Sequence, residues 1–341
     1  MSRGVTLLTT ACLLIAACAM AEEPKSTAEL VTLTDRTMGT VYSVKFLQPP
    51  APVGVGQARR EVGAVLERLE QAMSTYREDS EVCRFSTHRG GDWFAVSADT
   101  ARVVAESLRV SELTGGAFDV TVDPLVRLWG FGPRRETGEP PPEPAIAEAR
   151  RKVDWRKLQA RLHPPALRKT SPEISVDLSA IAKGYAADAI GAHLEKLGAT
   201  NYLIAISGEL KARGHGRQGL LWRVGVDKPL DDGCAIQRFV ELKDKAISTS
   251  GDYRNFFTDA GRRYSHVMDP RTGRPVTHNL ASVTIVADTS ARADALATGL
   301  MVLGPDTGYA LAAKRGWPCL FILRTESGFT EKVTPAFEKM R

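Results

Sequence analysis

The clearest alternation of apolar and polar positions lies in the segment ADTSARADALATGLMVLG, which begins at Ala287. Its apolar side chains follow the i, i+4, i+7 spacing of a helical stripe that packs against a core. They are Leu296, Leu300 and Leu303.

Asp294 and Thr298 are four residues apart and share another face of the same helix. Three N-cap candidates precede the stripe: Asp288, Thr289 and Ser290. The segment therefore predicts a helix that holds a carboxylate and a hydroxyl outward. Such oxygen ligands suit Mg2+, although most Asp-x-x-x-Thr pairs only face solvent.

A second segment with matching chemistry is SVDLSAIAKGYAADAIGAHLEKLGA, which begins at Ser175. It predicts a short strand that carries Asp177 and then a helix with Ser179 as N-cap and Gly198 at its end. The inward residues of this helix are Ile190, Leu194 and Leu197. Lys183 lies in the first turn, where a cation opposes the helix macrodipole. Unless Lys183 has a local acidic partner, a bound anion such as phosphate would explain its position. For this segment alone, a solvated lysine is the simpler interpretation.

Strand-like and helix-like patterns occur in groups along the rest of the chain. Helices are predicted over residues 57–73 and 98–114, and the Pro-, Glu- and Arg-rich stretch 133–148 is predicted as an exposed insertion. Strands are predicted over 30–46 (with a turn at Met38-Gly39-Thr40), 202–206, 210–213, 222–226, 239–243, 251–257, 264–268 and 282–287. Because strands come in runs with helices between the runs, the pattern favours an α+β fold with mixed or antiparallel sheets and packed helices over a doubly wound parallel sheet.

Composition and charge exclude only a few classes of function. The chain has 341 residues, of which 43% are hydrophobic and 25% charged, as in an ordinary soluble domain. The net charge of +5 is small, and no basic run indicates nucleic-acid binding. Gly214–Gly219 matches G-x-G-x-x-G, but the strand-like sequence LLWRVGVD follows where a dinucleotide-binding site needs a helix. A Rossmann site is therefore rejected.

The N-terminal residues have the features of an export signal. Arg3 supplies the positive charge, and Leu7–Ala17 form an apolar stretch too short to span a membrane. Small residues lead directly to Cys18, as in a bacterial lipoprotein signal that is cleaved before an acylated cysteine. Cleavage near Ala21, with loss of Cys18, is the alternative. We expect a signal peptide over 1–17, a tether over 18–30 and one domain over 31–341, exported and lipid-anchored to a bacterial membrane on its periplasmic side.

The domain would retain Cys83, Cys234 and Cys319. Their spacing matches no zinc motif, and an odd number leaves at least one free or intermolecularly bonded thiol.

Eight blocks along the chain together resemble one family, the ApbE-type FAD:protein FMN transferases. The blocks are MGTVYSV from Met38, MSTYREDSEVCRFS from Met73, GAFDVTVDPL from Gly116, VDLSAIAKGYAAD from Val176, SGE from Ser207, ISTSGDY from Ile247, YSHVMDPRTGRPV from Tyr264 and the Asp294 segment. They are spread in order over roughly residues 30–325.

The resemblance implies an ApbE-like, T-fold-related architecture. It also implies Mg2+-dependent transfer of FMN from FAD to a Thr or Ser hydroxyl of an acceptor protein, with release of AMP. The acceptors of such families are subunits of membrane redox pumps.

The resemblance also assigns roles to individual residues. The residues that would contact FAD are Met38, Tyr76, Ala117, Phe118, Asp119, Asp177, Lys183 and Met268. The metal would be held by the Ala180 carbonyl, Asp294 and Thr298. His266 is a candidate base for the acceptor hydroxyl, and Lys183 a candidate second cation at the diphosphate. Some relatives carry an acidic residue where this chain has Ala297, so backbone or water must complete the metal shell here.

Two other functions are compatible with the same residues. One is an FAD pyrophosphatase that uses water as acceptor and releases FMN and AMP. The other is a lipid-anchored FAD-binding protein without turnover, although binding alone would not need Asp294, Thr298, Lys183 and His266 together.

Overall fold

The computed structural model describes residues 29–48, 54–132 and 138–340. The predicted signal peptide, nearly all of the tether and the predicted lipidation site Cys18 lie outside these residues.

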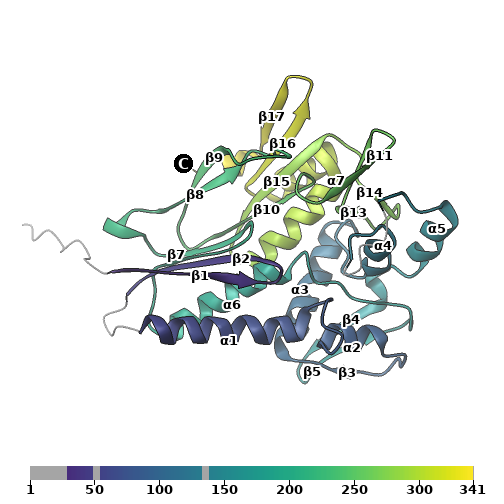
Figure 1. Cartoon of the computed structure of the whole chain (residues 1–341), viewed down its shortest axis with the longest axis horizontal. Helices are drawn as coiled ribbons and strands as arrows, with labels where there is room; N and C mark the ends of the chain where they lie inside the picture. Colours follow the sequence, from purple (N-terminus) through teal and green to yellow (C-terminus); the bar gives the residue numbers. More distant parts are fainter. Residues whose placement is uncertain (1–28, 49–53, 133–137, 341) are drawn as a thin grey trace, which may run out of the picture.

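An eight-stranded sheet organises the chain, and each strand pairs antiparallel with its neighbours (Figure 1). In spatial order the strands are β1 (Leu30–Thr37), β2 (Thr40–Leu47), β6 (Tyr202–Ile206), β7 (Glu209–Arg213), β10 (Ala246–Gly251), β15 (Leu280–Ala287), β16 (Cys319–Thr325) and β17 (Gly328–Val333). The order shows that strands distant in sequence, such as β2 and β6, become neighbours. This arrangement confirms the predicted α+β class with antiparallel pairing.

Helices cover one face of the sheet and enclose the main core. They are α1 (Val55–Met73), α3 (Ala98–Leu113), α6 (Ala182–Lys196) and α7 (Ser290–Arg315). In Figure 1, α1 and α6 run below β1 and β2. The apolar stripe predicted for α1 is buried throughout and comprises Val62, Val65, Leu66, Leu69 and Met73. The stripe of α7 is buried at Leu296 and Leu300 and half-buried at Leu303. Amphipathic periodicity therefore identified the faces that pack against the sheet.

The opposite face of the sheet carries a second, smaller core. The hairpin of β8 (Trp222–Asp227) and β9 (Ile236–Leu242) packs there together with α8 (Pro335–Glu338). Leu320 and Ile322 of β16 point into this second core, whereas Phe321 points into the main one. Strands β15 and β16 are thus buried on both faces along most of their length, and their sequences are correspondingly rich in apolar residues.

The remaining elements form a smaller lobe beside the sheet. They are α2 (Glu81–Thr87), β3 (Phe94–Ala95), α4 (Asp123–Leu128), α5 (Glu143–Arg151), β4 (Leu158–Leu162), β5 (Pro165–Lys169), β11 (Phe256–Asp259), β12 (Arg262–Ser265), β13 (Met268–Asp269) and β14 (Arg274–Pro275), with a short 3-10 turn at Trp155–Lys157. Another 3-10 turn, Arg217–Gly219, lies between β7 and β8. Strands β3, β5 and β4 form a three-stranded sheet, and a third apolar cluster lies under α4 and α5.

Several local predictions differ from the structure. Residues 174–178 form no strand, and α6 begins at Ala182, so Ser179 is not its N-cap; Ser179 instead donates its backbone N–H to the Asp177 carboxylate. The predicted pair of strands 251–257 and 264–268 is a shorter hairpin of β11 and β12, with the central strand β10 before it. Within the predicted exposed insertion, residues 143–151 form α5, which buries Ile146 against the third cluster. Residues 133–137 lie outside the described residues.

Helix α7 is interrupted within its length. Gly304 has a φ of 81°, and Pro305 follows it, so the helical hydrogen-bond ladder breaks at this point. None of the helices in the described part of the chain is long and apolar enough to cross a membrane. Within the same part of the chain, Cys83, Cys234 and Cys319 form no disulfide.

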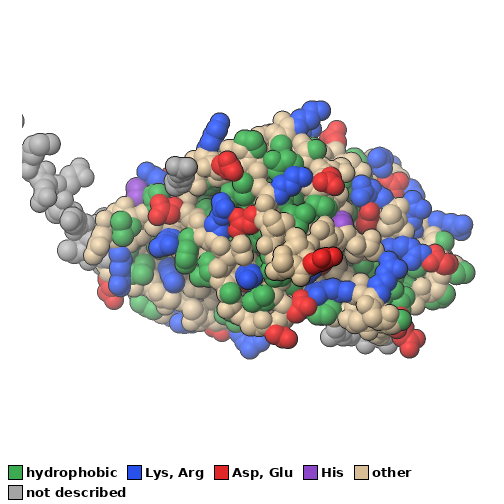
Figure 2. All heavy atoms as spheres, turned by 90° about the horizontal axis from the view of Figure 1, so that it is seen from above, with side chains coloured by type: hydrophobic (Ala, Val, Ile, Leu, Met, Phe, Trp, Pro, Cys, Tyr) green, Lys and Arg blue, Asp and Glu red, His purple; other side chains and the backbone are tan. Residues whose placement is uncertain are grey.

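One face of the molecule is shown in Figure 2. Lys and Arg side chains alternate there with Asp and Glu, and apolar side chains lie between them. The mixture matches the small net charge of +5.

Candidate functional site

A cleft of about 820 Å³ lies where the main sheet, α6, α7 and the smaller lobe meet. The predicted site residues that line it are Tyr76, Ala117, Phe118, Asp119, Asp177, Ala180, Lys183, His266, Met268, Asp294 and Thr298. They come from segments spread along the chain from Tyr76 to Thr298. Met38 is not among the lining residues, although Thr40, which opens β2, is. The structure therefore brings together nearly all of the predicted site.

Asp294 connects the cleft to the contact between α6 and α7. Asp294 is only 2% exposed, and its Oδ2 accepts the backbone N–H of Gly184 at 3.1 Å. In return, the Asp188 carboxylate of α6 accepts the N–H groups of Ser290 and Ala291 at the start of α7, both at 2.9 Å. The helices approach so closely that a Cβ on Gly184 would overlap the Ser290 carbonyl. We refer to Gly184, Asp188, Ser290, Ala291 and Asp294 as the α6–α7 junction.

Lys183 lies beside this junction among acidic groups. Its Nζ donates to the Ser179 carbonyl at 3.0 Å and lies 3.9 Å from Glu209 Oε1. Burial lowers the pKa of Lys183, but the charges of Glu209, Asp294 and Asp177 outweigh it, so the net shift is upward and the amine is charged. These carboxylates are the local acidic partners that the sequence left open. The position of Lys183 in the first turn is therefore no longer an independent sign of a bound anion.

Glu209 is a residue that the sequence analysis did not single out. It is 5% exposed and lines the cleft, and its Oε2 has no hydrogen-bond partner among the described residues. Burial raises its pKa to about 8, Lys183 opposes this rise and Asp294 adds to it. The SGE block contained this residue, but only the tertiary structure shows it facing Lys183. A buried carboxylate oxygen without a partner is costly unless a ligand or ion satisfies it.

Asp294, Thr298 and Ala180 all line the cleft. The Thr298 hydroxyl also contacts Ser250 Oγ at 2.9 Å, and Ala297 is buried in the main core. Within residues 29–48, 54–132 and 138–340, no group of three or more His, Cys, Asp or Glu side chains could hold a metal. Mg2+ does not need such a group, because it commonly takes one or two carboxylates together with substrate phosphates and water. The oxygen donors present, including the unpartnered Glu209 oxygen nearby, fit that cation.

The loop 117–121 forms another wall of the cleft. Ala117 and Phe118 are buried. The Asp119 carboxylate accepts hydrogen bonds from Thr121 N, Thr121 Oγ1 and Trp155 N at 2.8, 2.7 and 3.0 Å. Burial raises the pKa of Asp119 to about 6, and these hydrogen bonds counteract part of the rise. Oδ1 therefore fixes Thr121 within the loop, and Oδ2 holds the loop to Trp155. Asp119 thus stabilises the cleft wall and offers no unpaired carboxylate oxygen.

The orientation of His266 is set by one hydrogen bond. Its Nδ1 lies 3.1 Å from the Asn255 carbonyl oxygen, which can only accept, so Nδ1 carries the proton. His266 borders the cleft yet lies among protein atoms, and this desolvation, together with the Lys183 charge, lowers its pKa. The ring is thus neutral near pH 7 with its Nε2 lone pair free. Phe131 packs edge-on against it, with ring centroids 6.4 Å apart.

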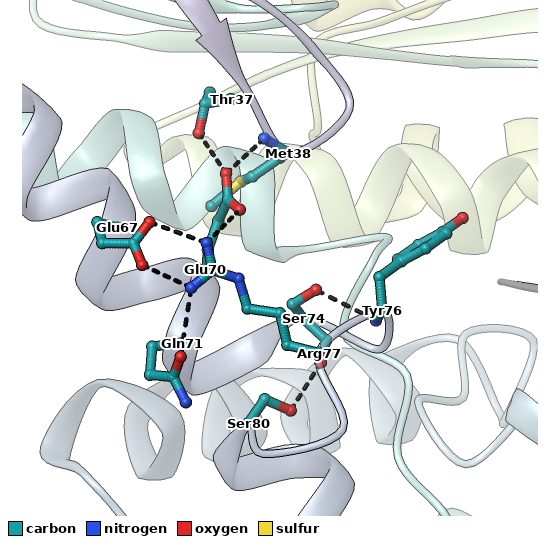
Figure 3. Close-up of polar contacts among 9 residues, drawn as sticks. All are labelled: Thr37, Met38, Glu67, Glu70, Gln71, Ser74, Tyr76, Arg77 and Ser80. Atoms are coloured by element: carbon teal, nitrogen blue, oxygen red, sulfur yellow. Dashed lines mark hydrogen bonds and ion pairs between the residues drawn. The ribbon is translucent and has the colours of Figure 1, made fainter.

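Tyr76 borders the cleft, and Met38 belongs to the turn whose residue Thr40 borders it; Figure 3 shows Met38 and Tyr76. Tyr76 is 69% exposed and borders the cleft, so its ring is available to a ligand. Met38 lies in the turn between β1 and β2, half-buried against the main core, with a φ of 47°. A positive φ is uncommon for a residue other than Gly, Asn or Asp. We refer to the Met38 turn (37–40) and the Tyr76 loop (74–80) as the cleft rim.

Comparisons with known proteins agree with this geometry. The model of the ApbE family matches residues 38–321. The FAD:protein FMN transferase of Vibrio cholerae is 42% identical over 326 residues, which cover 96% of this chain and 95% of that protein. The solved structure of the flavin transferase ApbE from Vibrio cholerae has a TM-score of 0.85 at 41% identity, over 92% of this chain and 100% of the other. The apo form of the Pseudomonas stutzeri flavinyl transferase ApbE has a TM-score of 0.84 at 38% identity, over 92% of this chain and 97% of that one.

Proposed function

The chain belongs to the ApbE family and transfers FMN from FAD to protein, and we propose that it does so in the cleft described above, with Mg2+, onto a Thr or Ser hydroxyl and with release of AMP. The observation that carries this proposal is the convergence of eleven predicted residues on one cleft of about 820 Å³. A cleft of this size accommodates a ligand as large as a dinucleotide.

The residues divide the cleft into parts with different chemistry. Tyr76 and the wall formed by Ala117 and Phe118 offer an aromatic ring and an apolar surface to the isoalloxazine. Met268 and Asp177 border the same cleft. Lys183 supplies a fixed positive charge for the diphosphate. The flavin therefore lies toward the exposed rim and the diphosphate toward the α6–α7 junction.

The transfer requires a nucleophile, a proton acceptor and a leaving group. The acceptor hydroxyl oxygen bonds to the phosphorus of the FMN half, and the bond from that phosphorus to the bridging oxygen breaks. AMP leaves with the electron pair. His266 Nε2 takes the hydroxyl proton, because Nδ1 already donates to Asn255. Lys183 stabilises the negative charge that grows on the departing phosphate.

Asp294, Thr298 and the Ala180 carbonyl are the residues that would hold Mg2+ beside the diphosphate. When bound, the ion would neutralise charge on the phosphate oxygens. The Gly184 N–H fixes one oxygen of Asp294 and leaves the other available to a ligand.

We propose, from the signal-like N-terminal sequence, that the protein is exported, lipid-anchored through Cys18 and faces the periplasm. Acceptors there would be subunits of membrane redox pumps, since these carry covalently bound FMN in the families that the chain resembles.

A labelling assay tests the transfer reaction and its competitors. Purified protein, FAD, Mg2+ and an acceptor domain should give a fluorescent flavin band on a denaturing gel, with one AMP released per label. AMP and free FMN without a label would instead indicate an FAD pyrophosphatase. Bound FAD with neither product would indicate a binding protein, and either result would contradict the proposal.

A further inference from the structure

Glu70 of α1 contacts both parts of the cleft rim. Its Oε1 accepts the Met38 N–H at 2.7 Å and the Thr37 hydroxyl at 2.9 Å. Its Oε2 accepts from Arg77, the residue after Tyr76, at 3.3 Å. In Figure 3, Glu70 lies between the Met38 turn and Arg77. One carboxylate therefore connects two segments that are far apart in sequence.

The Met38 turn needs such a partner. Thr37 pairs with Thr40, so Met38 and Gly39 form a two-residue hairpin turn, with φ values of 47° and 72°. Two positive φ values are typical of a type I′ turn, in which Asn or Gly normally occupies the first position. Methionine is disfavoured there, and strain of this kind is typical of functional sites. The charge-assisted hydrogen bond from Met38 N to Glu70 offsets part of the cost.

The Tyr76 loop is held from the same side. Arg77 forms two hydrogen bonds with Glu67, at 2.5 and 2.8 Å, and one with Gln71 at 3.2 Å. Tyr76 N donates to Ser74 Oγ at 3.2 Å, and Ser80 Oγ donates to the Ser74 carbonyl at 2.7 Å. The backbone around Tyr76 is thus ordered by polar contacts, while its ring is 69% exposed.

We propose that Glu70 is a positioning residue for FAD: it holds the Met38 turn and, through Arg77, the Tyr76 loop at the separation that receives the flavin. This role rests on the proposed function, because it requires the flavin to lie at the rim. Glu70 does not line the cleft, and its hydrogen bonds in the described part of the chain go to Thr37, Met38 and Arg77. None of these is Lys183, His266 or Asp294. Its loss should therefore weaken FAD binding without slowing the chemical step.

The test compares Glu70→Ala with the matched control Glu67→Ala in the full chain. Glu67 is bound to Arg77 but not to the Met38 turn in the described contacts, so its removal loosens only the Tyr76 side. FAD is titrated without acceptor, and binding is followed by quenching of flavin fluorescence.

We expect Glu70→Ala to raise the Kd and the KM for FAD about tenfold, while kcat stays within about twofold of the wild-type value. Glu67→Ala should raise the Kd and the KM for FAD by less than threefold. Glu70→Gln keeps one oxygen for Met38 and Thr37 and should restore part of the affinity.

The outcomes separate the two proposals. Equal Kd values for wild type and Glu70→Ala, or equal losses for Glu70→Ala and Glu67→Ala, would overturn the role of Glu70 and leave the flavin transfer untouched. A fall in kcat at unchanged Kd would also overturn it. If wild type itself binds no FAD, the proposed function fails and the role of Glu70 fails with it. Thermal unfolding of each variant shows whether a loss reflects unfolding, and Glu70→Gln supplies the folded comparison if Glu70→Ala does not fold.

Discussion

The α6–α7 junction and the cleft rim border one cleft but are held together in different ways. At the junction, a glycine permits backbone contact between two long helices, and carboxylates from each helix bind N–H groups of the other. At the rim, a strained turn and an exposed loop are joined by a single partly exposed carboxylate. Close packing allows little adjustment, whereas exposed hydrogen bonds open readily. We therefore expect changes at the junction to affect turnover and changes at the rim to affect binding.

The largest effect should follow from Asp294→Ala. The substitution removes the one carboxylate of the proposed Mg2+ ligand set, and loss of such charge stabilisation costs about a thousandfold in kcat. AMP release and flavin labelling measure the loss at saturating FAD, and Mg2+ titration shows whether the remaining rate still depends on metal. Asp294→Asn preserves the shape of the site and serves as the folded control. Wild-type turnover in both variants would remove Asp294 from the metal site.

The next largest effect should follow from His266→Asn. Loss of a general base typically costs at least about a hundredfold in kcat. In the wild type, burial lowers the pKa of His266, so the neutral ring persists below the ordinary value of 6.5. As pH falls further, protonation of Nε2 removes the base and kcat declines, so the wild-type profile should have an acidic limb below pH 6.5 that the variant lacks. His88→Gln on the surface of the smaller lobe should leave the profile unchanged. An identical acidic limb in His266→Asn would assign the titration to another group.

A substitution that disturbs helix packing should show more directly that turnover depends on the α6–α7 junction. Gly184→Ala places a Cβ on the Ser290 carbonyl and forces α6 away from α7. Overpacking of this kind costs about 1–3 kcal/mol of unfolding free energy, and kcat should fall with it. The control is Gly63→Ala on the exposed face of α1, where no atom lies within 4 Å of the added Cβ. That variant should be neutral or slightly more stable. Calorimetry and kcat measurements check both, and equal melting temperatures for the two variants would contradict the close contact.

The smallest effect should come from Tyr76→Ala at the rim. Loss of an aromatic stacking partner costs about 1 kcal/mol, or about fivefold in the KM for FAD, with kcat nearly unchanged. Tyr76→Phe retains the ring and should resemble wild type. A loss of kcat without a change in KM would place Tyr76 in the chemical step and weaken the distinction between the two regions.

The helices and most strands of the large sheet were predictable because their apolar periodicity survives in the structure. Helix α1 and the hairpin of β1 and β2 agree with the predicted ranges within about two residues. Thr289, one of three predicted N-cap candidates, caps α7 by accepting from Arg292 N. Short elements were missed, including α2, α4 and the β3–β5–β4 sheet, because a few residues carry too little periodicity to be recognised. Helix α5 was assigned to a loop because its proline- and charge-rich sequence outweighed the few apolar positions that it buries.

The sequence singled out some residues of the candidate site and missed others. Asp294 and Thr298 were evident from spacing on one helix, and the lysine of α6 from its unusual place in the first turn. The start of α6 was placed wrongly at Ser179, because that hydroxyl matched an N-cap pattern while the chain in fact turns for three more residues before the helix begins. Glu209, Asn255 and Glu70 went unnoticed because each acts through a partner remote in sequence.

The sequence by itself determined the periodic elements, the candidate ligands and, through eight ordered blocks, the family. Those properties depend on residue types at short spacings, which the chain displays directly. Tertiary structure alone decided that Glu209 faces Lys183, that Asn255 sets the tautomer of His266 and that Glu70 joins Met38 to Arg77. These contacts join residues up to 32 positions apart, and their geometry arises only when the antiparallel sheet brings the ends of distant strands and helices to one place.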